Sequence, residues 1–189
     1  MPRAIEFDMD VVLTAAMDEF RHRTFGGTSI KVLERATGLT SGSLYNSFGD
    51  KDAIFARALS HYNHVVVAAR IRDHMSGKSA TKGLRSLFLS LLQEPDGGSS
   101  GCLLTNSAIE FGSGESIARE GVSEGFQLLE DAFRAAVSKF RPGQEAATAL
   151  KLLALYQGVL VLVRFGHPKL RLRALINREI DDLTGESNA

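Results

Sequence analysis

Apolar positions recur at helical spacing along almost the whole of this 189-residue chain. In the first such segment, Val12, Ala16 and Phe20 would share one face of a helix, while charged side chains take the other faces. No run alternates between apolar and polar residues as a half-buried strand would, and no repeat of fixed period occurs. We therefore predict an all-α fold of about nine helices. The expected helices lie near residues 8–23, 29–36, 41–47, 50–75, 81–94, 101–111, 116–139, 144–165 and 168–183.

Residues that favour helix ends separate these segments. Asp8, Thr28, Thr40 and Asp50 each stand just before a predicted helix, where a side-chain oxygen can accept a bond from a free backbone N–H. Gly38 follows the second helix directly, at the position where a left-handed backbone conformation is common.

Composition narrows the class of protein without identifying it. Lys plus Arg and Asp plus Glu both number 22, so overall charge says nothing about a nucleic-acid partner and local charge must decide. The one cysteine rules out an internal disulfide and fits a reducing compartment. The N-terminal residues carry acids rather than a signal-peptide core, and the longest apolar run is far shorter than the ~20 residues of a membrane span. We expect a cytoplasmic protein without membrane contact.

The stretch TGLTSGSLYNSFGDKDAIF, residues 37–55, has a composition that a packed core does not need. Glycine, serine and threonine crowd it, and it contains the second of two short predicted helices joined by a tight turn. Two short helices joined in this way, with longer helices on either side, form a helix-turn-helix arrangement. In DNA-binding proteins of that type, the second helix enters the major groove with its N-terminal residues at the base edges.

The chemistry of this region suits DNA. Small residues at 41–43 would let the helix backbone approach closely, and the hydroxyl and amide groups can bond to phosphates or base edges. Helix N-termini at Thr28 and Thr40 would offer N–H groups to phosphates. Between residues 20 and 51, five basic residues outnumber two acidic ones. The predicted DNA-contacting residues are Thr28, Lys31, Thr40, Ser41, Gly42, Ser43, Tyr45, Asn46 and Lys51.

Alternatives remain open at this level. Helix-turn-helix pairs also occur in helical proteins that do not bind DNA, and Tyr45 could be a partly packed aromatic residue rather than a phosphate contact. Leu44 and Phe48, one helical turn apart, are expected to be core residues.

The segment VLERATGLTSGSLYNSFGDKDAIF resembles the signature of TetR-type transcriptional regulators. This similarity covers about residues 8–58. It implies a DNA-binding domain at 1–58 and an effector-binding and dimerisation domain at 59–189, in a homodimeric repressor released by a small molecule. Ser41 stands where many relatives have a basic or larger polar residue, so the operator sequence cannot be inferred. The positions that match the signature are Ala36, Gly38, Leu39, Thr40, Gly42, Leu44, Tyr45, Phe48, Lys51 and Ile54.

Residues 150–165, LKLLALYQGVLVLVRF, predict a helix that is apolar on nearly every side. Such a helix has to be covered on both sides. With the amphipathic helix at 169–183 it could pair with its two-fold mate, as the family resemblance implies. The alternative is the central core helix of a monomer. The predicted dimer-interface residues are Leu155, Gly158, Leu162, Leu172 and Ile176.

An effector pocket is expected among the helices at 81–94, 101–111, 116–139 and 144–165. Candidate lining residues, any of which could be plain core, are Phe88, Leu91, Cys102, Leu104, Phe126 and Tyr156. Cys102 has two interpretations. It follows Gly101 at a predicted helix start, which favours a reactive thiolate and a redox or electrophile sensor, yet cysteine is also a common buried side chain.

Catalytic and metal-binding patterns are weak in this chain. His61 and His64 would share a helix face, but no nearby carboxylate completes a ligand set. An enzyme is the alternative class, and a helical hydrolase would need a nucleophile–base pair that the sequence does not present. We expect no enzymatic activity, no cofactor and no metal.

Overall fold

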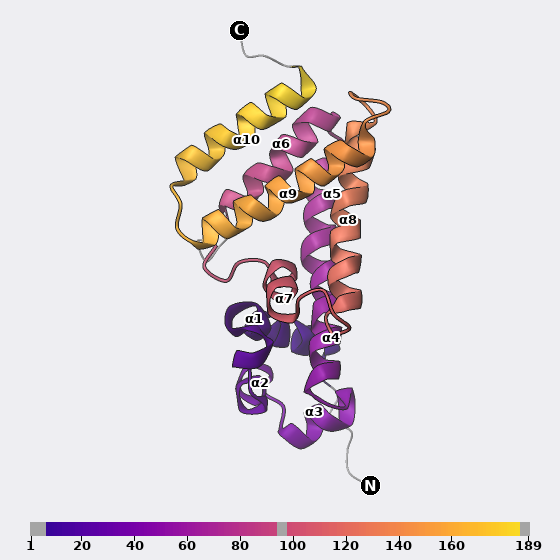
Figure 1. Ribbon diagram of the computed structural model, residues 1–189. Coiled ribbons are helices and arrows are strands. Elements are labelled where there is room, and N and C mark those ends of the chain that lie inside the picture. The colour runs from indigo at the N-terminus through magenta and orange to yellow at the C-terminus, as the bar shows by residue number, and fades with distance from the viewer. Residues whose placement is uncertain (1–6, 94–97, 186–189) are drawn as a thin grey trace. The chain divides into compact units, whose positions relative to one another are not determined.

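The computed structural model describes residues 7–93 and 98–185, and within these ranges every regular element is helical. The all-α prediction is confirmed. Figure 1 labels the helices, and the bounds of the first seven are α1 (Met9–Gly27), α2 (Ile30–Thr37), α3 (Ser41–Phe48), α4 (Lys51–Tyr62), α5 (Ala69–Met75), α6 (Ala80–Ser90) and α7 (Leu103–Phe111). The last three are α8 (Arg119–Val137), α9 (Glu145–Arg164) and α10 (Lys169–Thr184).

The predicted helix at 50–75 appears as three consecutive pieces. A π-helical segment, Asn63–Ala68, joins α4 to α5 without an intervening loop. If this continuous stretch counts as one helix, the described residues contain nine α-helices, as expected. A short 3-10 turn, Leu91–Gln93, extends α6.

Three of the four predicted N-caps are confirmed. The Asp8 carboxylate accepts from the Asp10 N–H, Thr40 Oγ1 accepts from the Ser43 N–H, and the Asp50 carboxylate accepts from the Ala53 N–H. Gly38 has the predicted left-handed conformation, with φ of 72°. The prediction for Thr28 is wrong: Ser29 caps α2, and its hydroxyl oxygen accepts from the N–H of the third residue of that helix.

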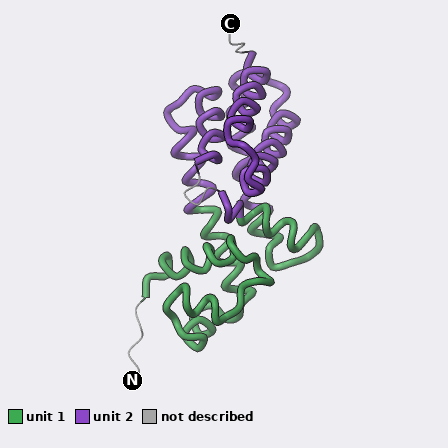
Figure 2. The backbone as a smooth tube through the Cα atoms, turned by 90° about the vertical axis from the view of Figure 1, so that its left-hand side faces the viewer, with its two compact units in different colours: residues 1–64, 103–122 green, residues 65–102, 123–189 purple. Residues whose placement is uncertain are grey.

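The chain forms two compact units, coloured separately in Figure 2. Unit 1 comprises residues 1–64 and 103–122, and unit 2 comprises residues 65–102 and 123–189. Residues 103–122, which hold α7 and the start of α8, thus pack with the N-terminal helices although they are distant in sequence. The functional division at residues 58 and 59 stays a prediction.

Aromatic side chains dominate the centre of unit 1. Phe20 of α1 and Phe55 of α4 meet edge to face, with ring centroids 5.0 Å apart, and both are almost fully buried. Phe25 and Phe111 complete the cluster, at 5.2 Å and 5.5 Å from the Phe55 ring. Edge-to-face and tilted pairs of this kind add to the free energy gained from burial alone.

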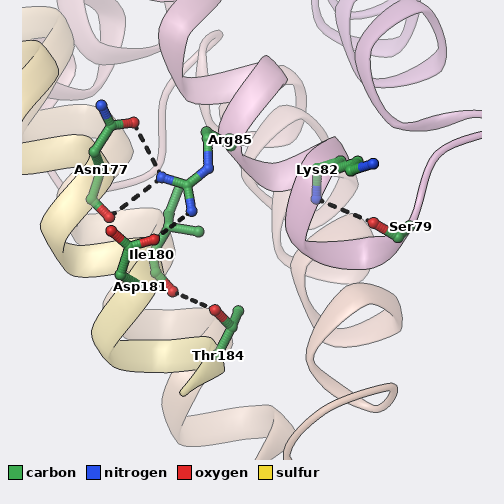
Figure 3. A network of polar contacts seen from close by, with 7 residues as sticks. All are labelled: Ser79, Lys82, Arg85, Asn177, Ile180, Asp181 and Thr184. Atoms are coloured by element: carbon green, nitrogen blue, oxygen red, sulfur yellow. Dashed lines mark hydrogen bonds and ion pairs between the residues drawn. The ribbon is translucent and has the colours of Figure 1, made fainter. Parts of the chain in front are cut away.

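Unit 2 has its own aromatic centre and a helix attached by polar contacts. Phe88, Phe133 and Tyr156 pack together with ring centroids 5.5–6.0 Å apart. The Arg85 guanidinium of α6 donates to Asn177 Oδ1 at 3.0 Å and forms an ion pair with Asp181, and both partners lie on α10 (Figure 3). Since both members of the ion pair are largely shielded from solvent, the pair fixes the position of α10 on α6.

One described helix, α9, is long and apolar enough to cross a membrane by length and composition, with a mean hydropathy of 1.8. The sequence analysis did not predict such a helix, because it considered only the longest uninterrupted apolar run. The buried core helix of a water-soluble protein passes the same test, and α9 buries Leu152, Tyr156 and Val159 within unit 2. Its burial is partial, which leaves part of the helix surface apolar and exposed.

Candidate nucleic-acid interface

The predicted helix-turn-helix is present in unit 1 as α2, a turn and α3. Leu33 of α2 and Leu44 of α3 are fully buried, and Phe48 at the end of α3 is 5% exposed. These apolar side chains fix one face of α3 against the helices around it. The helical period therefore turns the polar positions of α3 toward solvent.

The outward face of α3 carries the polar residues that the sequence singled out. Thr40, Gly42 and Asn46 are exposed, and Tyr45 is 45% exposed. Tyr45 is therefore accessible from solvent but also partly packed, so its assignment to a phosphate stays a prediction. Ser41 and Ser43 are half-buried. We refer to Thr40, Gly42, Ser43, Tyr45 and Asn46 as the α3 surface.

Two backbone N–H groups at the start of α3 already have acceptors within the protein. Thr40 Oγ1 accepts from the Ser43 N–H at 3.2 Å, and the Glu34 carboxylate accepts from the Ser41 N–H. A phosphate at this helix end would compete with them. Sequence reasoning missed Glu34, because the contact joins two helices across the turn and no capping pattern signals it.

Thr28 does not belong to this interface. Its side chain is fully buried, and its hydroxyl donates to the Thr24 carbonyl oxygen at 2.7 Å. Its own N–H donates to the Phe25 carbonyl oxygen at 3.2 Å. The prediction that Thr28 contacts DNA is wrong because both of its donors are used inside unit 1.

Basic side chains lie on α2 and α4, the two helices that flank α3 in the sequence. Lys31 and Arg35 are exposed on α2. Lys51 is the first residue of α4, and its Nζ lies 4.0 Å from the centroid of the Phe25 ring. An ammonium over an aromatic face is held by the ring quadrupole, so Lys51 has a preferred position. The arrangement offers cations for phosphates and polar side chains for base edges.

None of the predicted effector-pocket residues lines the open pocket that the described part of unit 2 contains, and their assignment stays a prediction. Phe88, Leu91 and Tyr156 are buried in the core of unit 2, whereas Leu104 is buried in unit 1. Phe126 is half-buried in unit 2. A cavity of about 330 Å³ in unit 2 is lined by other residues, among them Ile71, Met75, Lys78, Ala132, Ala136 and Lys139.

Cys102 is 5% exposed in unit 2, just before α7. Oxidation or alkylation of a thiol requires access, so this burial favours the packing interpretation.

The two histidines considered as metal ligands have protein partners: His61 Nε2 lies 2.9 Å from Thr14 Oγ1, and His64 Nδ1 lies 3.0 Å from the Ser60 carbonyl oxygen. The described residues hold no group of three potential metal ligands.

The predicted dimer-interface residues divide into two groups. Leu172 and Ile176 are 2% and 0% exposed because they pack within their own unit, so the prediction for these two is wrong. Leu155 and Gly158 are half-buried, and Leu162 is 36% exposed. The most exposed apolar side chains of this region lie outside the predicted list and are Leu150, Val161, Phe165 and Leu170. Leu175 is 36% exposed, like Leu162.

Comparison with known proteins agrees with this geometry. The family described as "Bacterial regulatory proteins, tetR family" matches residues 12–58. YezE, an uncharacterised HTH-type transcriptional regulator of Bacillus subtilis (strain 168), is 31% identical over 113 residues. That match spans 58% of this chain and 58% of the length of YezE.

Solved structures extend the likeness to nearly the whole chain. A cysteine variant of the TetR family regulator CifR, complexed with 26-base-pair double-strand operator DNA, is 27% identical with a TM-score of 0.78. The match covers 95% of this chain and 98% of CifR. A TetR family regulator from Cytophaga hutchinsonii has the same fold, with 22% identity, a TM-score of 0.80 and coverage of 97% and 98%.

The α2–α3 pair is a helix-turn-helix, and the chain has the fold of the regulators described above. Residues 12–58 match the TetR family of regulatory proteins, and the likeness to solved TetR family regulators covers nearly the whole chain. The family and these relatives are regulators rather than enzymes.

Proposed function

We propose that this protein binds a specific site in double-stranded DNA through α3 and controls transcription there. The observation that carries the proposal is the α3 surface, whose polar side chains are presented to solvent by a helix with a buried apolar face. Tyr45 and Lys51 are assigned to phosphates, while Ser43 and Asn46 are assigned to base edges. The operator complex of CifR supports a DNA partner of the same kind.

The proposed active species is a homodimer that pairs through α9 and α10. Exposed apolar residues concentrate near the junction of these helices, where Phe165 is 87% exposed and Leu170 is 79% exposed. A Cβ at Gly158 would meet no atom within 4 Å in its own chain, so a partner helix could approach closely there. Two copies of α3 can then contact successive major grooves, about 34–36 Å apart, of a palindromic operator.

The proposed role is repression relieved by a small effector that binds unit 2. The open pocket of about 330 Å³ beside Ile71, Met75 and Ala136 is the proposed effector site. An effector can release the operator only if it binds the two states of the dimer with different affinity. If a saturating effector leaves operator affinity unchanged, this part of the proposal fails. The proposed site of action is the cytoplasm, where the DNA is.

The experiment that tests the function is a salt titration of binding to the intergenic DNA upstream of the protein's own gene. A random duplex of equal length serves as the control, and the mass of the complex is measured alongside. We expect the upstream DNA to bind at least ~10³-fold more tightly than the random duplex. We also expect a complex that contains two protein chains.

The two other outcomes have distinct meanings. Equal and weak binding to both duplexes would contradict this choice of operator, and selection from a random DNA library would then identify the true one. Absence of binding even at low salt would contradict DNA recognition itself.

A further inference from the structure

The end of α1 is an unusual corner in the backbone of unit 1. Thr24 has φ of 66° and ψ of 175°, and it is the one residue other than glycine with positive φ in the described ranges. This backbone conformation belongs almost entirely to glycine, and another residue keeps it only where the surroundings enforce it. We call residues 24–28 the Thr24 corner.

Side chains of α7 hold this corner from outside the helix-turn-helix. The Glu110 carboxylate accepts from the Phe25 N–H at 2.8 Å through Oε2 and from the Gly26 N–H at 2.7 Å through Oε1. One turn earlier on α7, Asn106 Nδ2 donates to the Arg21 carbonyl oxygen at 3.0 Å. Both oxygens of Glu110 are therefore used on two adjacent backbone donors of the corner.

The corner leads directly to a proposed phosphate contact. The Phe25 ring, whose backbone N–H is bonded to Glu110, lies beneath the Lys51 ammonium at 4.0 Å. The same ring contacts Phe55 and Phe111, so its position is set on several sides. Glu110 itself is exposed, and its bonds to the two N–H groups orient its carboxylate toward the corner.

We propose that Glu110 is a positioning residue for DNA binding, which acts by fixing the Phe25 backbone and thereby the place of the Lys51 ammonium. This inference rests on the proposed function, since it assigns a role in operator binding to a residue outside the α3 surface. Glu110 does not touch DNA in this proposal.

The sign of the effect separates this role from simple electrostatics. Replacement of Glu110 by glutamine removes a negative charge from a protein that binds a polyanion, so long-range electrostatics alone would strengthen binding or leave it unchanged. Positioning predicts the opposite. The glutamine side chain has one acceptor oxygen, and its NH2 group faces a backbone N–H with which it cannot bond.

The test is a double-variant cycle on operator affinity in the full-length protein. We expect Glu110→Gln to weaken operator binding by about tenfold and to lower the salt slope by about one unit. We expect the same change in salt slope from Lys51→Ala, which removes the phosphate contact itself. In the Lys51→Ala background, Glu110→Gln should then add little further loss, because the group that it positions is gone. Fully additive losses would overturn the proposal, and so would stronger or unchanged binding by Glu110→Gln.

Glu115→Gln is the matched control. Glu115 is exposed and follows α7, and its carboxylate lies 3.6 Å from Arg119 Nε. The Glu115→Gln substitution removes the same charge from unit 1 as Glu110→Gln does, and we expect no loss of operator affinity. If Glu110→Gln fails to fold, Phe25→Leu keeps both N–H groups and removes the ring beneath Lys51 together with its contacts to Phe55 and Phe111. An unchanged salt slope in that variant would overturn the proposal.

Failure of the inference and failure of the function give different results. Wild-type protein that discriminates its operator while Glu110→Gln binds normally refutes the positioning role alone. Wild-type protein that binds no DNA refutes the proposed function.

Discussion

The two units bury similar aromatic clusters but differ in what they leave on the surface. Unit 1 centres on Phe20 and Phe55, and unit 2 centres on Phe88 and Phe133. Around its core, unit 1 exposes polar side chains on a short helix whose first turn is bonded within the protein. Unit 2 exposes apolar side chains on long helices, with Phe165 as the extreme case.

This difference indicates how each surface would find a partner. A polar surface held in place by caps suits hydrogen bonds to DNA, because the groups are already oriented when the partner arrives. An exposed apolar surface suits a second protein chain, since burial of apolar area is favourable without directional contacts. Five predictions test this contrast.

The largest effect is expected at the exposed end of α9. Two-fold symmetry places the Phe165→Glu substitution twice in the proposed dimer. At each copy, the lost burial of the phenyl ring weakens the free energy of dimerisation by about 1.5–3 kcal/mol. The dimer dissociation constant should therefore rise by roughly 10²–10⁴. Analytical ultracentrifugation over a range of concentrations measures this change. Val11→Glu, at an apolar residue of unit 1 that is 63% exposed, is the control and should leave the dimer intact.

A matched pair of core variants tests whether DNA binding belongs to unit 1. Leu44 of α3 and Leu87 of α6 are both fully buried, so replacement of either by alanine should lower the free energy of unfolding by about 2–5 kcal/mol. Only Leu44→Ala should also weaken operator binding by the folded protein. Urea unfolding and DNA titration at low temperature provide both numbers. Equal losses of DNA affinity in the two variants would contradict the assignment.

Asn46→Ala should alter sequence preference more than affinity for random DNA. Asn46 is exposed on α3, and a side-chain amide bonded to a base edge discriminates by about 1–3 kcal/mol. Binding selection on a library of operator variants would show relaxed preference at one position in each half-site. A uniform loss across all sequences would assign Asn46 to a phosphate instead.

Thr28→Val should reduce stability by about 1 kcal/mol and leave DNA affinity unchanged. Valine keeps the shape of the buried side chain but loses the hydroxyl that donates to the Thr24 carbonyl oxygen. Thermal unfolding and a salt titration measure the two properties. A lower salt slope with unchanged stability would restore Thr28 to the DNA interface.

The smallest effect is a pH dependence in unit 2. Burial, together with the nearby cations Lys78 and Arg70, lowers the pKa of the His74 imidazole below its ordinary value. The folded state thus favours the neutral ring. The contribution of His74 to stability is complete above the unfolded pKa of about 6.5 and is lost as pH falls through the lower folded pKa. We therefore expect the melting temperatures of the wild type and of His74→Asn to differ less at acid pH than above the unfolded pKa.

Several features of the molecule were predictable from short stretches of sequence. The helices, the break after residue 23, the left-handed Gly38 and the caps Asp8, Thr40 and Asp50 all depend on residues within one or two turns. The exposed face of α3 followed from the period of Leu44 and Phe48 in the same way. Capping and helical periodicity are local interactions, so the sequence alone determines them.

Other features were decided by packing between distant segments. Thr28 and Ser29 both carry a hydroxyl, and burial of Thr28 beside α1 left Ser29 to cap α2. In α10, packing against α6 determined that Leu172 points inward while Leu170 stays exposed.

The contact between Glu110 and the Thr24 corner joins residues that are 84 and 85 positions apart. No local pattern could place them together. A helical stripe states which residues share a face but not which face is covered, and that choice depends on the free energy of long-range packing in the completed fold.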